Sequence, residues 1–148
     1  MVLISWWYWM ADLLDQLALL DWLPEETLFS LVSRLHRLWG FPLAGQTCMA
    51  LFGHPQQGAQ HDLPSRLATL VSRTNGRLGT AVELARTRTL LAYYAPFIST
   101  QVIDAAVASM ASDSVAHLKL KLGILTSRFR ANHPLKSCPQ CIREDDLP

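Results

Sequence analysis

The chain has 148 residues, of which 50% are hydrophobic and 17% charged. This is enough apolar material for one domain with a core, and it excludes a mainly disordered chain. The net charge of +1 is uneven, because residues 28–137 carry twelve bases against four acids, a net +8. A polyanion is therefore a candidate partner of the central region. The alternative is that these arginines are scattered over helical surfaces and only interact with solvent.

The first 22 residues form a Trp-rich extension. This segment lacks Lys and Arg, and Asp12, Asp15 and Asp21 interrupt it before a membrane span of about 20 residues is complete. We therefore expect no membrane association, and a segment that is helical from about Met10 and packs on the domain or on a partner. The alternative interprets the aromatic residues 6–9 as an interfacial anchor.

The first strong helix signal covers residues 24–39. Pro24 is expected at its first position, Glu25 and Glu26 in its first turn, and Gly40 at its end. Apolar residues recur at helical spacing and predict one buried stripe, with Arg34 and Arg37 facing away. The stripe consists of Leu28, Leu31, Val32, Leu35, Leu38 and Trp39. His36 lies at its edge, where a half-buried packing role is expected.

Residues 45–52 predict a short second helix that ends at Gly53. Cys48 lies among apolar neighbours in it, where a small buried hydrophobic side chain is expected. A Cys48 nucleophile would need a base, His36 or His54, and a third group that orients the base. No such signature surrounds Cys48.

Two further helices with a short turn between them predict a helix-turn-helix pair. The first begins at Asp62 or Pro64 and is capped by Gly76, and the second covers residues 80–91, where Thr80 and Glu83 form a capping box. On the second helix Arg86 lies nearly opposite the buried Leu84, whereas Arg88 falls on the apolar side and must snorkel or lie past the helix end. Any two short packed helices can give the same pattern.

The candidate nucleic-acid contacts come from this pair and from the basic segment ahead of the C-terminal cysteines. Arginines in the turn and on the exposed face of the second helix are suited to DNA phosphates or base edges. The complete set is Arg73, Arg77, Arg86, Arg128, Arg130 and Lys136.

The region after the pair predicts a Pro-containing connection over residues 93–99 and an alanine-rich helix over residues 100–112. Residues 115–125 alternate as a strand would but also fit a helix. We expect irregular or helical structure to about residue 125, followed by an extended run into the cysteines.

Cys138 and Cys141 form a C-x₂-C pair near the end of the chain. Three cysteines, an odd number, fit a reducing, cytoplasmic compartment and a metal or redox role better than a disulfide framework. Two thiolates supply half of a tetrahedral zinc site. Zinc is therefore the candidate cofactor of an incomplete site, with His133, Cys48, another chain or solvent as the further ligand.

The ordered series of segments resembles the TniQ family of transposon target-site selection proteins. The resemblance covers about residues 23–147 and rests on LPEETLFSLVSRLHRLWG, LFG, HDLPSRLATL, TLLAYYAPFIS, LGILTSRFR and LKSCPQCIREDD. It implies a mainly α fold, in which a small helical domain with a helix-turn-helix is followed by half of a zinc-knuckle motif. Cys138 and Cys141 match the first half of the family's zinc motif, whose second half would lie beyond Pro148.

The domain organisation that follows is an extension over residues 1–22, a helical domain over residues 23–130 and an incomplete zinc-finger segment over residues 131–148. The resemblance implies a non-catalytic adaptor that couples target recognition, through DNA or an RNA-guided complex, to the transposon's AAA+ ATPase regulator. The alternative is a small helix-turn-helix DNA-binding regulator, and a homodimer stays open in both cases. We do not expect an enzyme, because the sequence shows no paired carboxylates, no phosphate-binding loop and no nucleophile with its base.

Overall fold

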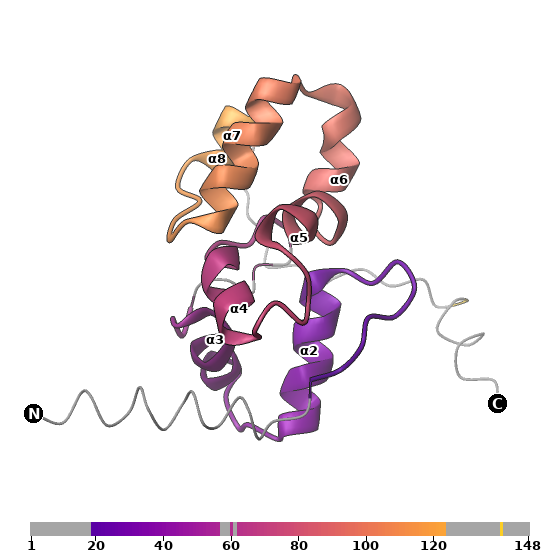
Figure 1. The fold of residues 1–148 in the computed structure, drawn as a ribbon, viewed down its shortest axis with the longest axis vertical. Helices are drawn as coiled ribbons and strands as arrows, with labels where there is room; N and C mark the ends of the chain where they lie inside the picture. The colour runs from indigo at the N-terminus through magenta and orange to yellow at the C-terminus, as the bar shows by residue number, and fades with distance from the viewer. Residues whose placement is uncertain (1–18, 57–59, 61, 124–139, 141–148) are drawn as a thin grey trace, which may run out of the picture.

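The computed structural model describes residues 19–56, 60, 62–123 and 140, and within these residues it contains helices and turns but no β-strand. This confirms the mainly α fold class (Figure 1). The zinc-knuckle half of the prediction lies outside the described residues. The elements are α2 (Leu28–Trp39), α3 (Ala44–Phe52), α4 (Leu67–Arg73), α5 (Ala81–Thr87), α6 (Leu91–Tyr94), η1 (Ala95–Phe97), α7 (Thr100–Ala111) and α8 (Leu118–Lys121).

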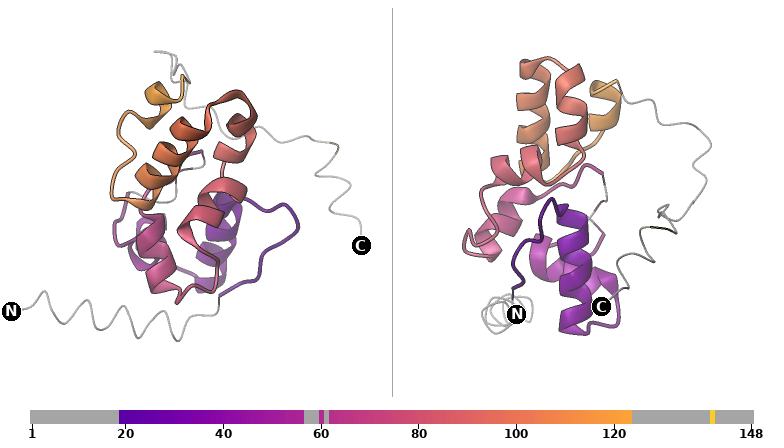
Figure 2. Two further views of the ribbon diagram at one scale, coloured as in Figure 1. Left: turned by 45° about the horizontal axis from the view of Figure 1, so that its top comes forward. Right: turned by 90° about the vertical axis from the view of Figure 1, so that its right-hand side faces the viewer.

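Helix α5 lies at the centre of the molecule. In Figures 1 and 2, α2, α3 and α4 lie on one side of it, and α6, α7 and α8 lie on the other. Helix α5 packs directly against α4, α6 and α7, while α3 packs on α2 and α4, and α8 on α7. The two halves of the core meet at α5 and at a direct contact between α4 and α7. None of the helices in the described part of the chain is long and apolar enough to cross a membrane.

Helix α2 begins four residues later than the sequence pattern predicts. Thr27 is its N-cap and accepts a hydrogen bond from the Ser30 N–H at 3.3 Å. The chain turns just before it, where Glu25 has a φ of 54°. The prediction that Glu25 and Glu26 occupy the first turn is therefore wrong. Gly40 ends the helix as predicted, with a φ of 66° and its N–H bonded to the His36 carbonyl.

The predicted stripe of α2 is confirmed at Leu28, Leu31, Val32 and Leu35, which are buried. Trp39 is half-buried, and Leu38 is 52% exposed. The predicted buried stripe therefore does not continue through the last turn of α2. Arg37 faces solvent, but Arg34 does not face away as predicted. Its guanidinium bonds the buried Glu26 carboxylate at 2.7 Å.

Two further helix boundaries differ from the predictions. Helix α4 begins at Leu67 because Arg66 has a left-handed φ of 63° and donates its N–H to the Ser112 carbonyl at 2.7 Å. The helix predicted over residues 80–91 ends at Thr87, and a separate α6 follows. The expected connection over residues 93–99 is itself largely helical, as the end of α6 and as η1.

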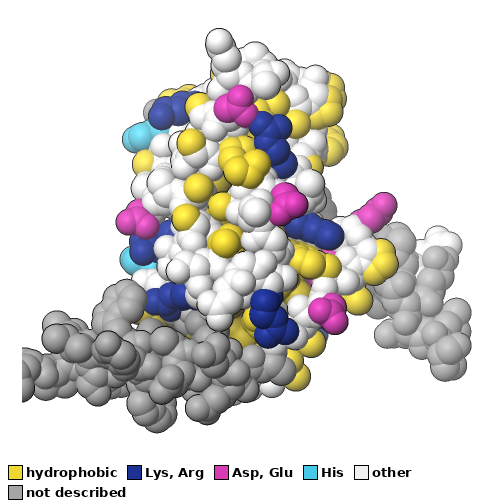
Figure 3. Space-filling model, in the orientation of Figure 1, with side chains coloured by type: hydrophobic (Ala, Val, Ile, Leu, Met, Phe, Trp, Pro, Cys, Tyr) yellow, Lys and Arg dark blue, Asp and Glu magenta, His cyan; other side chains and the backbone are white. Residues whose placement is uncertain are grey.

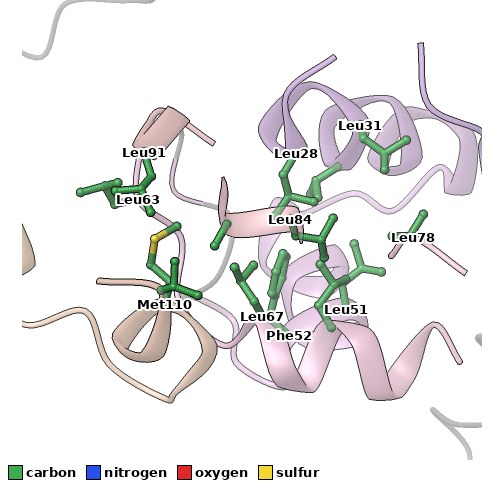
Figure 4. Packing of buried hydrophobic residues seen from close by; sticks show 14 of the residues in the cluster. Leu28, Leu31, Leu51, Phe52, Leu63, Leu67, Leu78, Leu84, Leu91 and Met110 are labelled. Atoms are coloured by element: carbon green, nitrogen blue, oxygen red, sulfur yellow. The ribbon is translucent and has the colours of Figure 1, made fainter. Parts of the chain in front are cut away.

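One hydrophobic cluster joins the two halves of the fold (Figure 4). Leu84 of α5 and Leu28 of α2 point toward each other, next to Phe52 and Leu67, while Met110 lies with the residues of the other half. Leu84 is 1% exposed. Truncating a leucine in such a position leaves a cavity and costs about 2–5 kcal/mol.

Candidate interaction surfaces

Helices α4 and α5, the predicted helix-turn-helix pair, are consecutive and pack against each other, with the connection formed by residues 74–80. Gly76 and Gly79 have φ values of 71° and 111°, which residues with side chains rarely adopt. The predicted capping box is confirmed, because Thr80 Oγ1 accepts from the Glu83 N–H at 3.2 Å and Glu83 Oε2 accepts from the Thr80 N–H at 2.9 Å. The latter hydrogen bond lowers the pKa of the Glu83 carboxyl group.

Residues ahead of α2 hold this turn in place. The indole N–H of Trp22 donates to the Leu78 carbonyl at 3.1 Å, and the Arg88 guanidinium carbon lies 4.5 Å from the centre of the Trp22 ring. Arg88 lies just past the end of α5, one of the two positions predicted for it. Its carbonyl accepts from the Leu28 N–H at 2.7 Å. Both ends of α5 are thus tied to the chain that leads into α2.

Arg73, one of the candidate nucleic-acid contacts, is turned inward. Its guanidinium donates to the carbonyls of Met49 and Ala50 near the end of α3, with a distance of 2.6 Å to Ala50. Burial lowers the pKa of Arg73, with a smaller contribution from the neighbouring Arg66 charge. A Cβ at Gly53 would lie 3.2 Å from Arg73 Nη2, so this position leaves little room for a side chain. A phosphate could bind Arg73 only by displacing these bonds.

Arg66 bonds the same end of α3, which sequence reasoning missed. Its Nε donates to the Phe52 carbonyl at 2.7 Å, and its Nη1 lies 3.3 Å from Asp113 Oδ1. The last carbonyls of a helix lack a partner from a following helical turn, and Arg66 supplies one to the Phe52 carbonyl. Periodicity gave no reliable signal for Arg66, because it lies ahead of α4 with a left-handed backbone.

Arg86 lies on the exposed side of α5, as predicted, and forms an ion pair with Asp104 of α7. The two side chains are 42% and 60% exposed. Sequence reasoning did not identify Asp104. Arg86 is therefore exposed on its helix, but it already forms an ion pair with an acid.

The remaining basic side chains of the described region are few. The described residues together carry nine Lys or Arg and seven Asp or Glu, a net charge of +2. Four of the bases form ion pairs, and Arg73 and Arg88 bind carbonyls. Within the part of the chain that is described, Arg37, Arg77 and Lys121 are exposed and have no ion pair. On the face shown in Figure 3, basic side chains are scattered and acidic ones lie between them.

An uncharged apolar surface runs along α6 and η1, which we call the α6–η1 face. It consists of Leu90, Tyr93 and Phe97, which are 36%, 71% and 81% exposed. The Tyr93 ring also contacts Tyr94 edge-on, with 5.4 Å between ring centres. The spacing from Leu90 to Tyr93 and Phe97 is that of one helix face. Asp104 is the only charged residue between Thr89 and Ser112, and it pairs with Arg86.

Cys48 is half-buried, not fully buried as expected, and burial raises the pKa of its thiol. A raised thiol pKa disfavours the reactive thiolate. His36 is half-buried, as predicted, and its Nδ1 lies 2.8 Å from Thr47 Oγ1. The His36 ring therefore packs and hydrogen-bonds within the α2–α3 interface.

The structure does not describe the candidate zinc ligands Cys138, Cys141 and His133. The basic residues Arg128, Arg130 and Lys136 also lie outside the described residues. Elsewhere, within the residues whose placement is given, no group of three or more His, Cys, Asp or Glu side chains could hold a metal ion.

Two comparisons with known proteins bear on these surfaces. A family model described as TniQ matches residues 19–148. The chain is also 26% identical over 119 residues to the transposon Tn7 transposition protein TnsD of Escherichia coli. That similarity covers 80% of this chain and 23% of the relative, so the chain spans less than a quarter of that protein.

Proposed function

Because the chain belongs to the TniQ family, we propose that it takes part in target-site selection during transposition as a non-catalytic adaptor. It links target recognition to the transposon's AAA+ ATPase regulator and contacts nucleic acid. The similarity to a Tn7 transposition protein supports the process. The protein partner and the nucleic-acid contact rest on the family resemblance and on the surfaces described above.

The observation that carries the adaptor role is the α6–η1 face. Large apolar side chains that protrude from a surface are characteristic of protein interaction sites, and aromatic residues are enriched in such interfaces. Tyr93 and Phe97 are 71% and 81% exposed in a segment whose single charge is already paired. An uncharged surface has no electrostatic attraction for a phosphate backbone. A protein therefore suits this face better than DNA or RNA.

In this proposal the chain binds nucleic acid more weakly than it binds its protein partner. The helix-turn-helix pair contributes Arg77, which is exposed in the turn, and Arg86, which pairs with Asp104. The segment with Arg128, Arg130 and Lys136 adds three more bases. Each phosphate contact adds about 0.9 to the slope of binding against the logarithm of salt concentration. A slope of a few units, characteristic of backbone binding, is expected.

Zinc fits the chemistry of the C-terminal cysteines. Cys138 and Cys141 provide the thiolate donors that structural zinc sites use, with His133 as the candidate third ligand. Metal analysis of the purified protein should give nearly one equivalent, and a Cys138→Ser variant should lose it. Substoichiometric metal in both proteins would contradict a working site.

The proposed function is tested by binding of the full chain to the AAA+ regulator encoded by the same transposon, with and without duplex DNA. The adaptor role requires association in at least one of these conditions. Its absence in both would contradict the proposal.

A small helix-turn-helix regulator is the second candidate, because α4 and α5 are consecutive helices that pack against each other. That role requires sequence preference, since base contacts, not phosphate contacts, discriminate between sites. On α5, however, Glu83 is engaged in the capping box and Arg86 in an ion pair. Competition between selected and random duplexes at one salt concentration separates the two roles, because the regulator discriminates and the adaptor alone does not.

A further inference from the structure

The interface between α5 and α7 contains a charge arrangement that the sequence pattern does not explain. The segment between Thr89 and Ser112, which includes all of α6, η1 and α7, has Asp104 as its single charged residue. That one carboxylate lies against Arg86, the single basic residue within α5. Helix α7 thus brings its only charge to the position that neutralises the exposed base of α5.

The pair is well placed to be opened by a competing anion. Both side chains are substantially exposed, at 42% for Arg86 and 60% for Asp104. Ion pairs in such solvated positions add little to stability, and salt screens them. The main consequence of the Arg86–Asp104 pair is therefore local. The pair cancels the positive charge of Arg86 and places a carboxylate where a phosphate would approach.

We infer that Asp104 limits nucleic-acid binding by α5, because its carboxylate occupies one nitrogen of the exposed Arg86 guanidinium, cancels its charge and repels an approaching phosphate. This inference rests on the nucleic-acid contact in the proposed function. The cost is the same for every duplex that contacts Arg86, so Asp104 lowers the affinity for nucleic acid without discriminating between sequences.

The test compares the binding of full-length variants to a random-sequence duplex over a range of salt concentrations. Asp104→Asn removes the charge and keeps the shape of the side chain. It should raise the affinity about two- to five-fold at low salt, the size expected for one exposed ion pair. The salt slope should become steeper by about 0.9, the value for one additional phosphate contact. In an Arg86→Gln background the same substitution should produce neither change.

Asp113→Asn is the matched control. It removes the same charge from an exposed acid, but its partner Arg66 has a 19% exposed side chain that also bonds the Phe52 carbonyl. It should leave the salt slope unchanged. Equal effects of the two substitutions would mean that only the net charge matters, and would overturn the inference. An Asp104→Asn effect that persists without Arg86, or the absence of duplex binding by wild type and variant alike, would also overturn it.

Binding to the AAA+ regulator, measured with the same preparations, separates failure of the inference from failure of the proposed function. Association that is retained while Asp104→Asn has no effect on duplex binding leaves the adaptor role intact and rejects the inference. Loss of regulator association together with the expected Asp104→Asn effect supports the inference and rejects the adaptor role. Circular dichroism and thermal unfolding verify that each variant is folded.

Discussion

The indole N–H of Trp22 donates a 3.1 Å hydrogen bond to the Leu78 carbonyl, across 56 positions of the chain. This bond connects the segment ahead of α2 to the turn of the helix-turn-helix pair, and the Arg88 guanidinium stacks on the same indole ring. The orientation of α5 therefore depends on residues that precede the first described helix.

Trp22→Phe and Trp22→Ala should separate the two contributions of this side chain. Trp22→Phe keeps an aromatic ring below Arg88 but leaves the Leu78 carbonyl without its donor, at a cost of about 1 kcal/mol. Trp22→Ala also removes the packing of a half-buried ring and should cost about 2–4 kcal/mol. Urea unfolding measures both values. Equal stabilities of the two variants would show that the ring itself contributes nothing.

Arg73 and Arg77 should differ sharply in their effect on stability although both belong to the helix-turn-helix region. Arg73→Ala removes the donor to the Met49 and Ala50 carbonyls and should destabilise the fold by about 1–3 kcal/mol. Arg77→Ala alters an exposed side chain and should stay within about 0.5 kcal/mol of wild type. Thermal unfolding of the two variants provides the measurement. A stable Arg73→Ala protein would return Arg73 to the group of accessible nucleic-acid contacts.

Glu26 should make the stability of the fold depend on pH in the acidic range. Burial alone raises the pKa of its carboxyl group, but hydrogen bonds from the Leu23 N–H, Arg34 and Ser30 outweigh burial and leave the pKa below its ordinary value of 4.5. A carboxyl group with a lowered pKa in the folded state stabilises the protein above the unfolded-state value. This contribution is lost as pH falls through the folded-state pKa.

Replacing Glu26 by Gln should therefore reduce the loss of stability on acidification below about pH 4.5. Unfolding of the wild type and of the Glu26→Gln variant at several pH values between neutral and strongly acidic conditions tests this prediction. The two proteins should differ most near neutral pH and converge in acid. Parallel curves would show that Glu26 has the same pKa in the folded and unfolded chains.

The features that sequence reasoning predicted correctly are determined by neighbouring residues. The buried positions Leu28 to Leu35 follow from helical spacing, and the Gly40 stop follows from its left-handed backbone. The Thr80–Glu83 capping box likewise needs only four consecutive residues. Each of these can be recognised without knowing where the rest of the chain lies.

Several of the errors arose where a distant part of the chain determines the outcome. Helix α4 starts late because Arg66 bonds Ser112, more than 40 positions away. The two candidate contacts Arg73 and Arg86 look alike in the sequence, but one binds the end of α3 and the other an acid on α7. Periodicity gives the direction of a side chain on its own helix, but not the partner that it meets there.

If the α6–η1 face binds the AAA+ regulator, as proposed, a Tyr93→Ser/Phe97→Ser double variant should weaken that binding. Both side chains protrude, so the variant should fold normally. Leu43→Ser is the matched control, because it also removes an exposed apolar side chain, 66% exposed, but at the start of α3, on the other side of α5. The measurement is the dissociation constant of each variant for the regulator by titration calorimetry.

Exposed aromatic residues that anchor an interface each contribute about 1–2 kcal/mol or more when they are truncated. The double variant should therefore bind the regulator at least about tenfold more weakly, while Leu43→Ser binds within about twofold of wild type. A folded double variant with unchanged affinity would contradict the assignment of this face to the regulator.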